Sequence, residues 1–272
     1  MCIFQKLKLL HVESRLCDIV LLLLTQGLLN LEDLGINNCE ELEEMFKPEG
    51  FLSQGNHQEQ LLLSRLTVSR CKRLRQLFTL TIAKSLQKLT FLNIDRCDEL
   101  EHLITQDDQI LPEAHLQHTC FPQLVEVSVN ECNKMTCLFP VTIADGLLRL
   151  RRVEIKGASQ FVEVFAQKDG RDGQIRKDVI LPKLKYLRFA QLPCLVNLCP
   201  RNYHFTLPSL YRLELDVLTC PDITDRFTRT LDDVVHVNGE VSTIPAVGFV
   251  LFFFFGSAFY LILLLVTTNK YY

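Results

Sequence analysis

The chain has 272 residues, with 29 Lys and Arg against 32 Asp and Glu, and a formal net charge of -3. Nucleic-acid-binding domains normally carry a basic excess gathered on one face, so this balance predicts no nucleic-acid partner. The 11 cysteines are odd in number and lie mostly at apolar positions. That usage favours a reducing compartment.

The beginning of the chain holds a degraded repeat. Leu7, Leu10 and Val12 have a spacing that becomes regular from residue 31 onward. Glu13 and Asp18 interrupt the apolar stretch that follows, so no signal-peptide core of normal length is present. The sequence also lacks any N-x-[ST] glycosylation sequon. Both observations predict that the repeats lie in the cytosol.

One phrase, L-x-x-L-x-[IV]-x-x-C-x-x-L-x-x-[LM]-F, is then repeated along the chain. Its L-x-[IV] core alternates side chains across a strand, whereas the later leucines recur every three residues, as in a helical or 3₁₀ turn. A single unit cannot bury its apolar edge alone, so neighbouring units must stack. The copies, some of them loose, begin at Leu31, Leu63, Leu89, Leu124, Leu150, Leu184 and Leu210.

This pattern predicts an α/β fold, namely a leucine-rich-repeat solenoid. We expect a curved parallel sheet on its concave face and short helices and loops on its convex face. The units come in pairs, since Cys71 maps onto Cys132 at an offset of 61 residues. Polar inserts at 47–60, 105–119 and 166–178 separate the pairs and are expected to form loops.

Cysteines occupy one position of the repeat, directly after the strand. They are Cys39, Cys71, Cys97 and Cys132. A small side chain with a weak donor suits a buried turn, so we expect these thiols to be reduced. One cysteine per repeat cannot assemble a tetrahedral cluster, and the sequence therefore predicts no metal site and no cofactor.

The end of the chain is apolar. Residues 244–268 contain no charged side chain, and as a helix they could cross a hydrocarbon core of about 30 Å. We expect a repeat domain over 1–222 with about eight repeats, a linker over 223–243, a C-terminal transmembrane helix over 244–268 and a tail over 269–272. The alternative is that this apolar segment is not native, which would leave the chain cytoplasmic.

Catalytic motifs are missing from the sequence. It contains no G-x-x-x-x-G-K-[ST] phosphate loop, no H-E-x-x-H metal motif and no G-x-S-x-G nucleophile motif. We therefore expect no enzymatic activity and no small-molecule substrate.

The polar positions of the strands are the remaining functional feature. A residue between two buried strand positions must point to the opposite face of the sheet. The predicted row is polar and mixed in charge, with aromatic and arginine residues late in the chain, which suits protein binding. A merely solvated sheet face explains the row as well. The candidate protein-binding residues are Arg65, Thr67, Asn93, Asp95, Ser128, Arg152, Glu154, Tyr186, Arg188, Tyr211 and Glu214.

Several phrases together carry a family resemblance. The cysteine-containing repeat, the C-D-E-L-E ending at Cys97 and the F-P-x-L re-entry at Phe121 resemble the C-terminal repeats of plant coiled-coil nucleotide-binding leucine-rich-repeat disease resistance proteins. The resemblance covers most of residues 1–220. It implies a non-enzymatic recognition module in plant defence, whose partner is a pathogen effector, a host protein or a nucleotide-binding resistance protein.

The sequence departs from that family in two ways. No nucleotide-binding domain precedes the repeats, so we expect the module to lack its own switch, and an apolar segment follows them. The alternative is therefore a tail-anchored leucine-rich-repeat scaffold or adaptor without a defence role.

Overall fold

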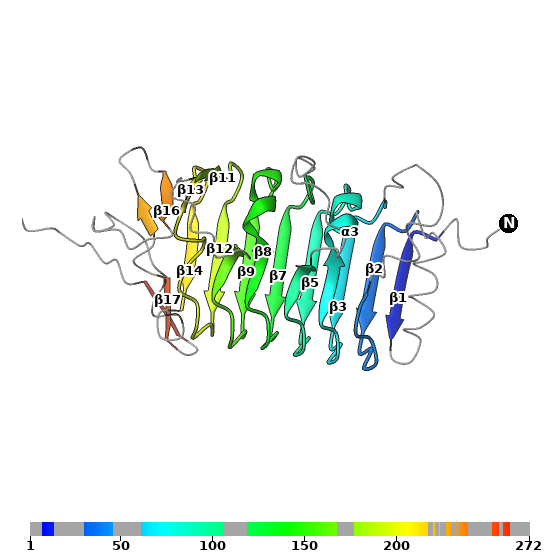
Figure 1. The fold of residues 1–272 in the computed structure, drawn as a ribbon. Helices are drawn as coiled ribbons and strands as arrows, with labels where there is room; N and C mark the ends of the chain where they lie inside the picture. The colour runs from blue at the N-terminus through cyan, green and yellow to red at the C-terminus, as the bar shows by residue number, and fades with distance from the viewer. Residues whose placement is uncertain are drawn as a thin grey trace, which may run out of the picture.

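The structure is a computed structural model. It describes residues 7–13, 30–45, 61–105, 119–167, 177–216, 220, 223, 227–229, 232, 234–238, 252–255 and 258–261. Figure 1 shows the described strands standing side by side in a long row, with α3 and the shorter strands forming a second layer against it.

The row is one parallel sheet built from one strand of each repeat. Its repeat strands are β1 (Leu9–Glu13), β2 (Asp33–Asn37), β3 (Arg65–Ser69), β5 (Phe91–Asp95), β7 (Glu126–Asn130), β9 (Arg152–Lys156), β12 (Tyr186–Ala190) and β14 (Arg212–Leu215). They pair in that order, each parallel to the next. Leu66 lies opposite Leu92, which lies opposite Val127, so equivalent repeat positions are in register. The leucine-rich-repeat sheet predicted from the L-x-[IV] spacing is confirmed.

The core fills the space between this sheet and the return path of each repeat. From β2 onward the second and fourth residues of the repeat strands are buried, and Leu92 and Ile94 have no exposed surface. Behind them runs a stack of phenylalanines in which Phe78 and Phe121 have ring centroids 5.4 Å apart. Tilted aromatic pairs at this separation add to the free energy of burial. The repeats therefore share one continuous core.

The return path of the repeats contains short strands as well as helical turns. Its elements are β4 (Gln76–Thr79), α3 (Leu80–Ser85), β6 (His102–Thr105), β8 (Cys137–Pro140), the 3₁₀ helix η4 (Val141–Gly146) and β10 (Glu163–Ala166). The spacing predicted turns at Leu77 and Phe78, but these residues lie in β4, which pairs with β6. Both side chains are buried, and parallel pairing satisfies the backbone groups beside them.

A four-stranded sheet closes the second layer at the C-terminal end. It has the order β11 (Lys177–Ile180), β13 (Tyr203–Leu207), β16 (Val235–Asn238) and β15 (Phe227–Arg229). The stretch 223–243, which we expected to be a linker, therefore carries two strands among its described residues. Their buried Phe227, Val235 and Val237 belong to the same core as the repeats.

The predicted C-terminal helix is not supported. The residues described within 244–268 form β17 (Phe252–Phe255) and β18 (Ala258–Leu261), which pair antiparallel, and the rest of that range lies outside the described residues. Phe252 pairs with Glu214, so β17 supplies backbone partners to the last repeat strand. Among the residues that the structure describes, no helix is long and apolar enough to cross a membrane.

The cysteines after the strands are buried, as expected. Cys71, Cys97 and Cys132 are free thiols, and Cys71 Sγ donates to the carbonyl of Ser69 at 3.4 Å. A hydrogen bond with the Cys97 thiol, followed by burial, raises the pKa of the Cys71 thiol, so it stays protonated. Cys39 differs from the expectation of reduced thiols, because it is disulfide-bonded. No group of three or more potential metal ligands occurs within the described ranges.

The residue that follows a repeat strand adopts a left-handed conformation. These residues are Asn38, Arg70, Arg96, Glu131, Gly157 and Gln191. The turn lets the Arg70 N–H donate to the Asp95 carbonyl at 2.8 Å, in the neighbouring repeat. A side chain at such a position is strained, and glycine is not.

Gly157→Ala is therefore expected to lower the free energy of unfolding by about 1–2 kcal/mol. The added Cβ would lie 3.2 Å from Cγ of Glu131, at a φ of +67°. In contrast, Arg70→Gly relieves a φ of 55° and should not destabilise the fold. Urea unfolding of the two variants measures the difference. Equal losses of stability in both would argue against backbone strain at this position.

Candidate functional site

The surface of interest is the face of the long sheet that points away from the core, which we call the open face. It is formed by the first, third and fifth residues of the repeat strands, since the second and fourth are buried. Pairing in register lines up the third residues as Gly35, Thr67, Asn93, Ser128, Glu154, Arg188 and Glu214.

The structure brings ten of the candidate residues onto this face. Arg65, Arg152 and Tyr186 lie in the row of first residues, and Asp95 lies in the row of fifth residues. Tyr211 directly precedes β14 and lies outside the three rows, although its side chain is 74% exposed. Arg212, which the spacing places beside this row, lies at a first strand position, and so do Phe91 and Glu126, which are not among the candidates. The sequence signal for these three residues is their position two residues before the third residue of each strand, which puts them on the same face of the sheet.

The row of third residues is uncharged on β3, β5 and β7. Thr67, Asn93 and Ser128 stand next to one another on β3, β5 and β7, and all three are partly exposed. Beside them the Arg65 guanidinium lies over the Phe91 ring, 4.5 Å from its centroid. This part of the face offers short polar side chains without charges that a partner would have to desolvate.

The C-terminal part of the face is organised around a buried carboxylate. The Glu214 side chain is only 2% exposed. It accepts hydrogen bonds from the Tyr186 hydroxyl at 2.9 Å and from Arg212 Nε at 2.5 Å. Nε of Arg188 lies 3.5 Å from Glu214 Oε2. Three partners therefore compensate for the loss of hydration of this charge.

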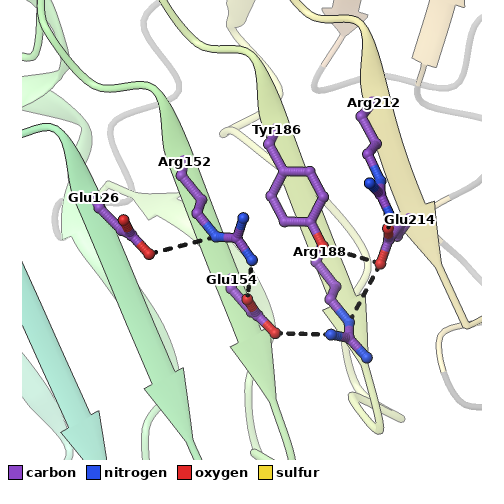
Figure 2. A network of polar contacts seen from close by, with 7 residues as sticks. All are labelled: Glu126, Arg152, Glu154, Tyr186, Arg188, Arg212 and Glu214. Carbon is purple, nitrogen blue, oxygen red and sulfur yellow. Dashed lines mark hydrogen bonds and ion pairs between the residues drawn. The ribbon is translucent and has the colours of Figure 1, made fainter.

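A second carboxylate extends the network toward the N-terminal repeats. Glu154 accepts from Arg152 Nη2 at 2.9 Å and from Arg188 Nη1 at 3.0 Å. Glu126 Oε1 lies 3.4 Å from Nε of Arg152. Figure 2 shows the resulting chain of polar contacts across β7, β9, β12 and β14. Arg152 and Arg188 thus contact carboxylates of neighbouring strands, whereas Arg212 contacts Glu214 of its own strand.

Tyr186 lies between two arginines. The Arg152 guanidinium is 4.1 Å from the Tyr186 ring centroid, and that of Arg212 is 5.3 Å from it. Burial, followed by the hydrogen bond to Glu214, raises the pKa of the Tyr186 hydroxyl to about 12. The hydroxyl therefore remains a donor to Glu214 at physiological pH.

A carboxyl group on the return path also titrates unusually. Glu163 in β10 pairs in register with Cys137 and with Asn197. Its side chain is partly buried, and burial raises its pKa to about 7 from an ordinary value of 4.5. The Oδ1 atom of Asn197 is buried without a hydrogen-bond partner. The surroundings of Glu163 thus favour its neutral form.

A pH dependence of stability follows from this group. Its folded pKa exceeds its unfolded pKa, so its contribution is complete below about pH 4.5 and is lost as the pH rises to about 7. We expect a loss of about 1–2 kcal/mol over that window, less than the full shift implies because the group is partly exposed. Glu163→Gln should remove this slope, whereas Glu101→Gln, at an exposed site, should keep it. Urea titrations between pH 4 and pH 8 measure the slope, and its persistence in Glu163→Gln would exclude Glu163 as its source.

Comparison with known families gives one match. The family profile described as "Plant disease resistance protein RPS2-like, leucine-rich repeats" matches residues 61–98 and 104–236. The matched residues run from β3 to the first half of β16, with a gap at 99–103, and cover most of the open face. Searches with the whole chain returned no significant match to a curated protein or to a solved structure.

Proposed function

The chain belongs to the leucine-rich repeats of RPS2-like plant disease resistance proteins, and we propose that it is a recognition module whose open face binds a protein partner. Domains of this kind are typically non-catalytic, and the partner that the family implies is a pathogen effector, a host protein or a nucleotide-binding resistance protein. The proposed role is therefore sensing in plant defence by surface complementarity.

The observation that carries this proposal is the in-register open face. Successive repeats present their third strand residues about 4.8 Å apart, so a partner can contact several repeats at once. The face combines uncharged third residues, at Thr67, Asn93 and Ser128, with arginine and tyrosine side chains held by the Glu214 network. Tyrosine and arginine are enriched among the residues that dominate binding energies at protein interfaces.

The test replaces two short polar side chains in the middle of the open face with the long side chain of arginine. Asn93→Arg with Ser128→Arg should reduce cross-linking to a partner in plant tissue at least tenfold, because both side chains are partly exposed and central. Gln160→Arg is the matched control, since it adds the same side chain at an exposed turn away from the open face. Circular dichroism would verify that all variants are folded. A partner that is retained by the double variant, or lost with Gln160→Arg, would contradict the proposal.

The alternative function is a membrane-anchored repeat scaffold without a defence role. The uncharged composition of 244–268 favours it, because apolar residues partition into the bilayer while each charge at its centre costs about 2.5–3.5 kcal/mol. If this alternative holds, membranes washed with carbonate should retain the unaltered full chain. The double variant Phe254→Arg with Leu261→Arg should be released from them. Release of the unaltered chain by carbonate would rule it out.

A further inference from the structure

Basic side chains gather where the last three repeat strands begin, on and directly beside the C-terminal end of the open face. The segments 149–154, 183–188 and 209–214 each comprise the three residues before a strand and its first three residues, in β9, β12 and β14. Together they contain two carboxylates, at Glu154 and Glu214. Their seven basic residues are Arg149, Arg151, Arg152, Lys183, Lys185, Arg188 and Arg212. We call these seven residues, with Tyr211, the basic surface.

The earlier repeats do not share this charge. The corresponding segments of β2, β3, β5 and β7 contain two basic and three acidic residues, which are Glu32, Asp33, Arg65, Lys88 and Glu126. The basic surface is therefore local to the last three repeat strands and cannot be read from the net charge of -3. An acidic partner would be attracted to this end of the open face rather than to the whole chain.

Backbone pairing holds the outer residues of the basic surface side by side. The N–H of Lys185 donates to the Arg151 carbonyl at 2.9 Å, and the N–H of Tyr211 donates to the Lys185 carbonyl at 3.2 Å. An arginine, a lysine and a tyrosine thus lie side by side in three successive repeats, about 4.8 Å apart. Tyr211 is the most exposed of the large hydrophobic side chains that the structure describes.

Cations point outward on this surface and carboxylates lie beneath them. The side chains of Arg152, Arg188 and Arg212 are 41%, 32% and 48% exposed, against 21% for Glu154 and 2% for Glu214. The carboxylates hold the guanidinium groups in place, and part of each guanidinium group faces solvent.

The remaining cations of the basic surface form no ion pair within the part of the chain that the structure describes. Arg149, Arg151, Lys183 and Lys185 are exposed, and none of them forms an ion pair with the residues that the structure describes. Their charges are therefore not neutralised within the described fold and are available to a partner of opposite sign.

We propose that the basic surface binds an acidic polypeptide segment, an extended stretch rich in Asp and Glu. This inference rests on the proposed protein-binding function and specifies the partner. The distance from β9 to β14 is about 9.6 Å, which three residues of an extended chain cover at about 3.3 Å per residue. Pre-positioned guanidinium forks match carboxylates in a bidentate geometry, and the exposed Tyr211 ring offers apolar contact area beside the charges.

The experiment measures the fluorescence anisotropy of a labelled twelve-residue Asp/Glu peptide with the full chain at 50 mM and 300 mM salt. A peptide with Asn and Gln at the same positions is the ligand control. Arg151→Glu with Lys185→Glu should weaken binding of the acidic peptide at least tenfold. Lys72→Glu with Arg75→Glu changes the charge by the same amount at exposed sites outside the basic surface, and it should leave the affinity within twofold.

Binding that prefers the acidic peptide, weakens with salt and depends on Arg151 and Lys185 supports the inference. Equal binding of both peptides, or equal weakening by the control variant, overturns it. Binding of a single-stranded RNA or of phosphatidylserine vesicles without binding of the acidic peptide overturns it too, and would reassign the surface. If the acidic peptide fails while Asn93→Arg with Ser128→Arg still abolishes partner cross-linking, only this inference falls and the proposed function stands.

Discussion

Leu92→Ala is expected to lower the free energy of unfolding by about 2–5 kcal/mol, because it leaves a cavity in a core that can collapse only in part. Leu92 has no exposed surface and lies between Leu66 and Val127 of the neighbouring repeats. Repeat proteins couple each unit to its neighbours, so the loss should spread to adjacent repeats.

Urea unfolding followed by circular dichroism measures this loss. Asn93→Ala is the matched control, since it shortens the next residue of the same strand on the open face. The control should change stability by less than about 0.5 kcal/mol. Equal effects of the two substitutions would contradict the assignment of Leu92 to the core face of the sheet.

Arg188→Met with Arg212→Met is expected to cost about 3–5 kcal/mol, because it strips a buried carboxylate of both positive partners. Glu214 is only 2% exposed, and of the three partners described above only the Tyr186 hydroxyl would remain. The methionines keep much of the apolar stem of each arginine, so the loss reports on the charges rather than on packing.

Adding Glu214→Leu to that double variant should recover most of the lost stability. Replacing a whole buried ionic set with apolar side chains is often neutral or stabilising, whereas removal of one side of it is not. Urea unfolding of the double and triple variants completes the comparison. If the triple variant is no more stable than the double variant, the loss of stability comes from lost packing by the arginine stems and not from an unpaired carboxylate.

The sequence was sufficient to predict most of the open face. Strand side chains alternate with a period of two, so the apolar positions of β5, such as Leu92 and Ile94, also identify Asn93 as a residue of the opposite face. Tyr211 is the exception, because it directly precedes the first residue of β14. A strand boundary depends on pairing with the neighbouring repeat, which the local spacing does not contain.

The return path and the C-terminal region were less predictable. Leucines that recur every three residues predicted turns, yet Leu77 and Phe78 lie in a strand, because the next repeat offers them a parallel partner. The residues described within 244–268 likewise pair as strands, although an uncharged stretch of that length predicts a helix. In both cases hydrogen bonds between segments override the local pattern.

The sequence by itself determined the repeat, the strand positions and the face on which each strand residue lies, because these follow from spacings within one unit. Only the tertiary structure decided which polar residues meet and how deeply they are buried. Glu214 receives its hydrogen bond from Tyr186, 28 residues away, and it pairs with Arg188 of the same neighbouring strand. The burial of a charge and the position of its partners depend on the stacking of whole repeats, which no single repeat specifies.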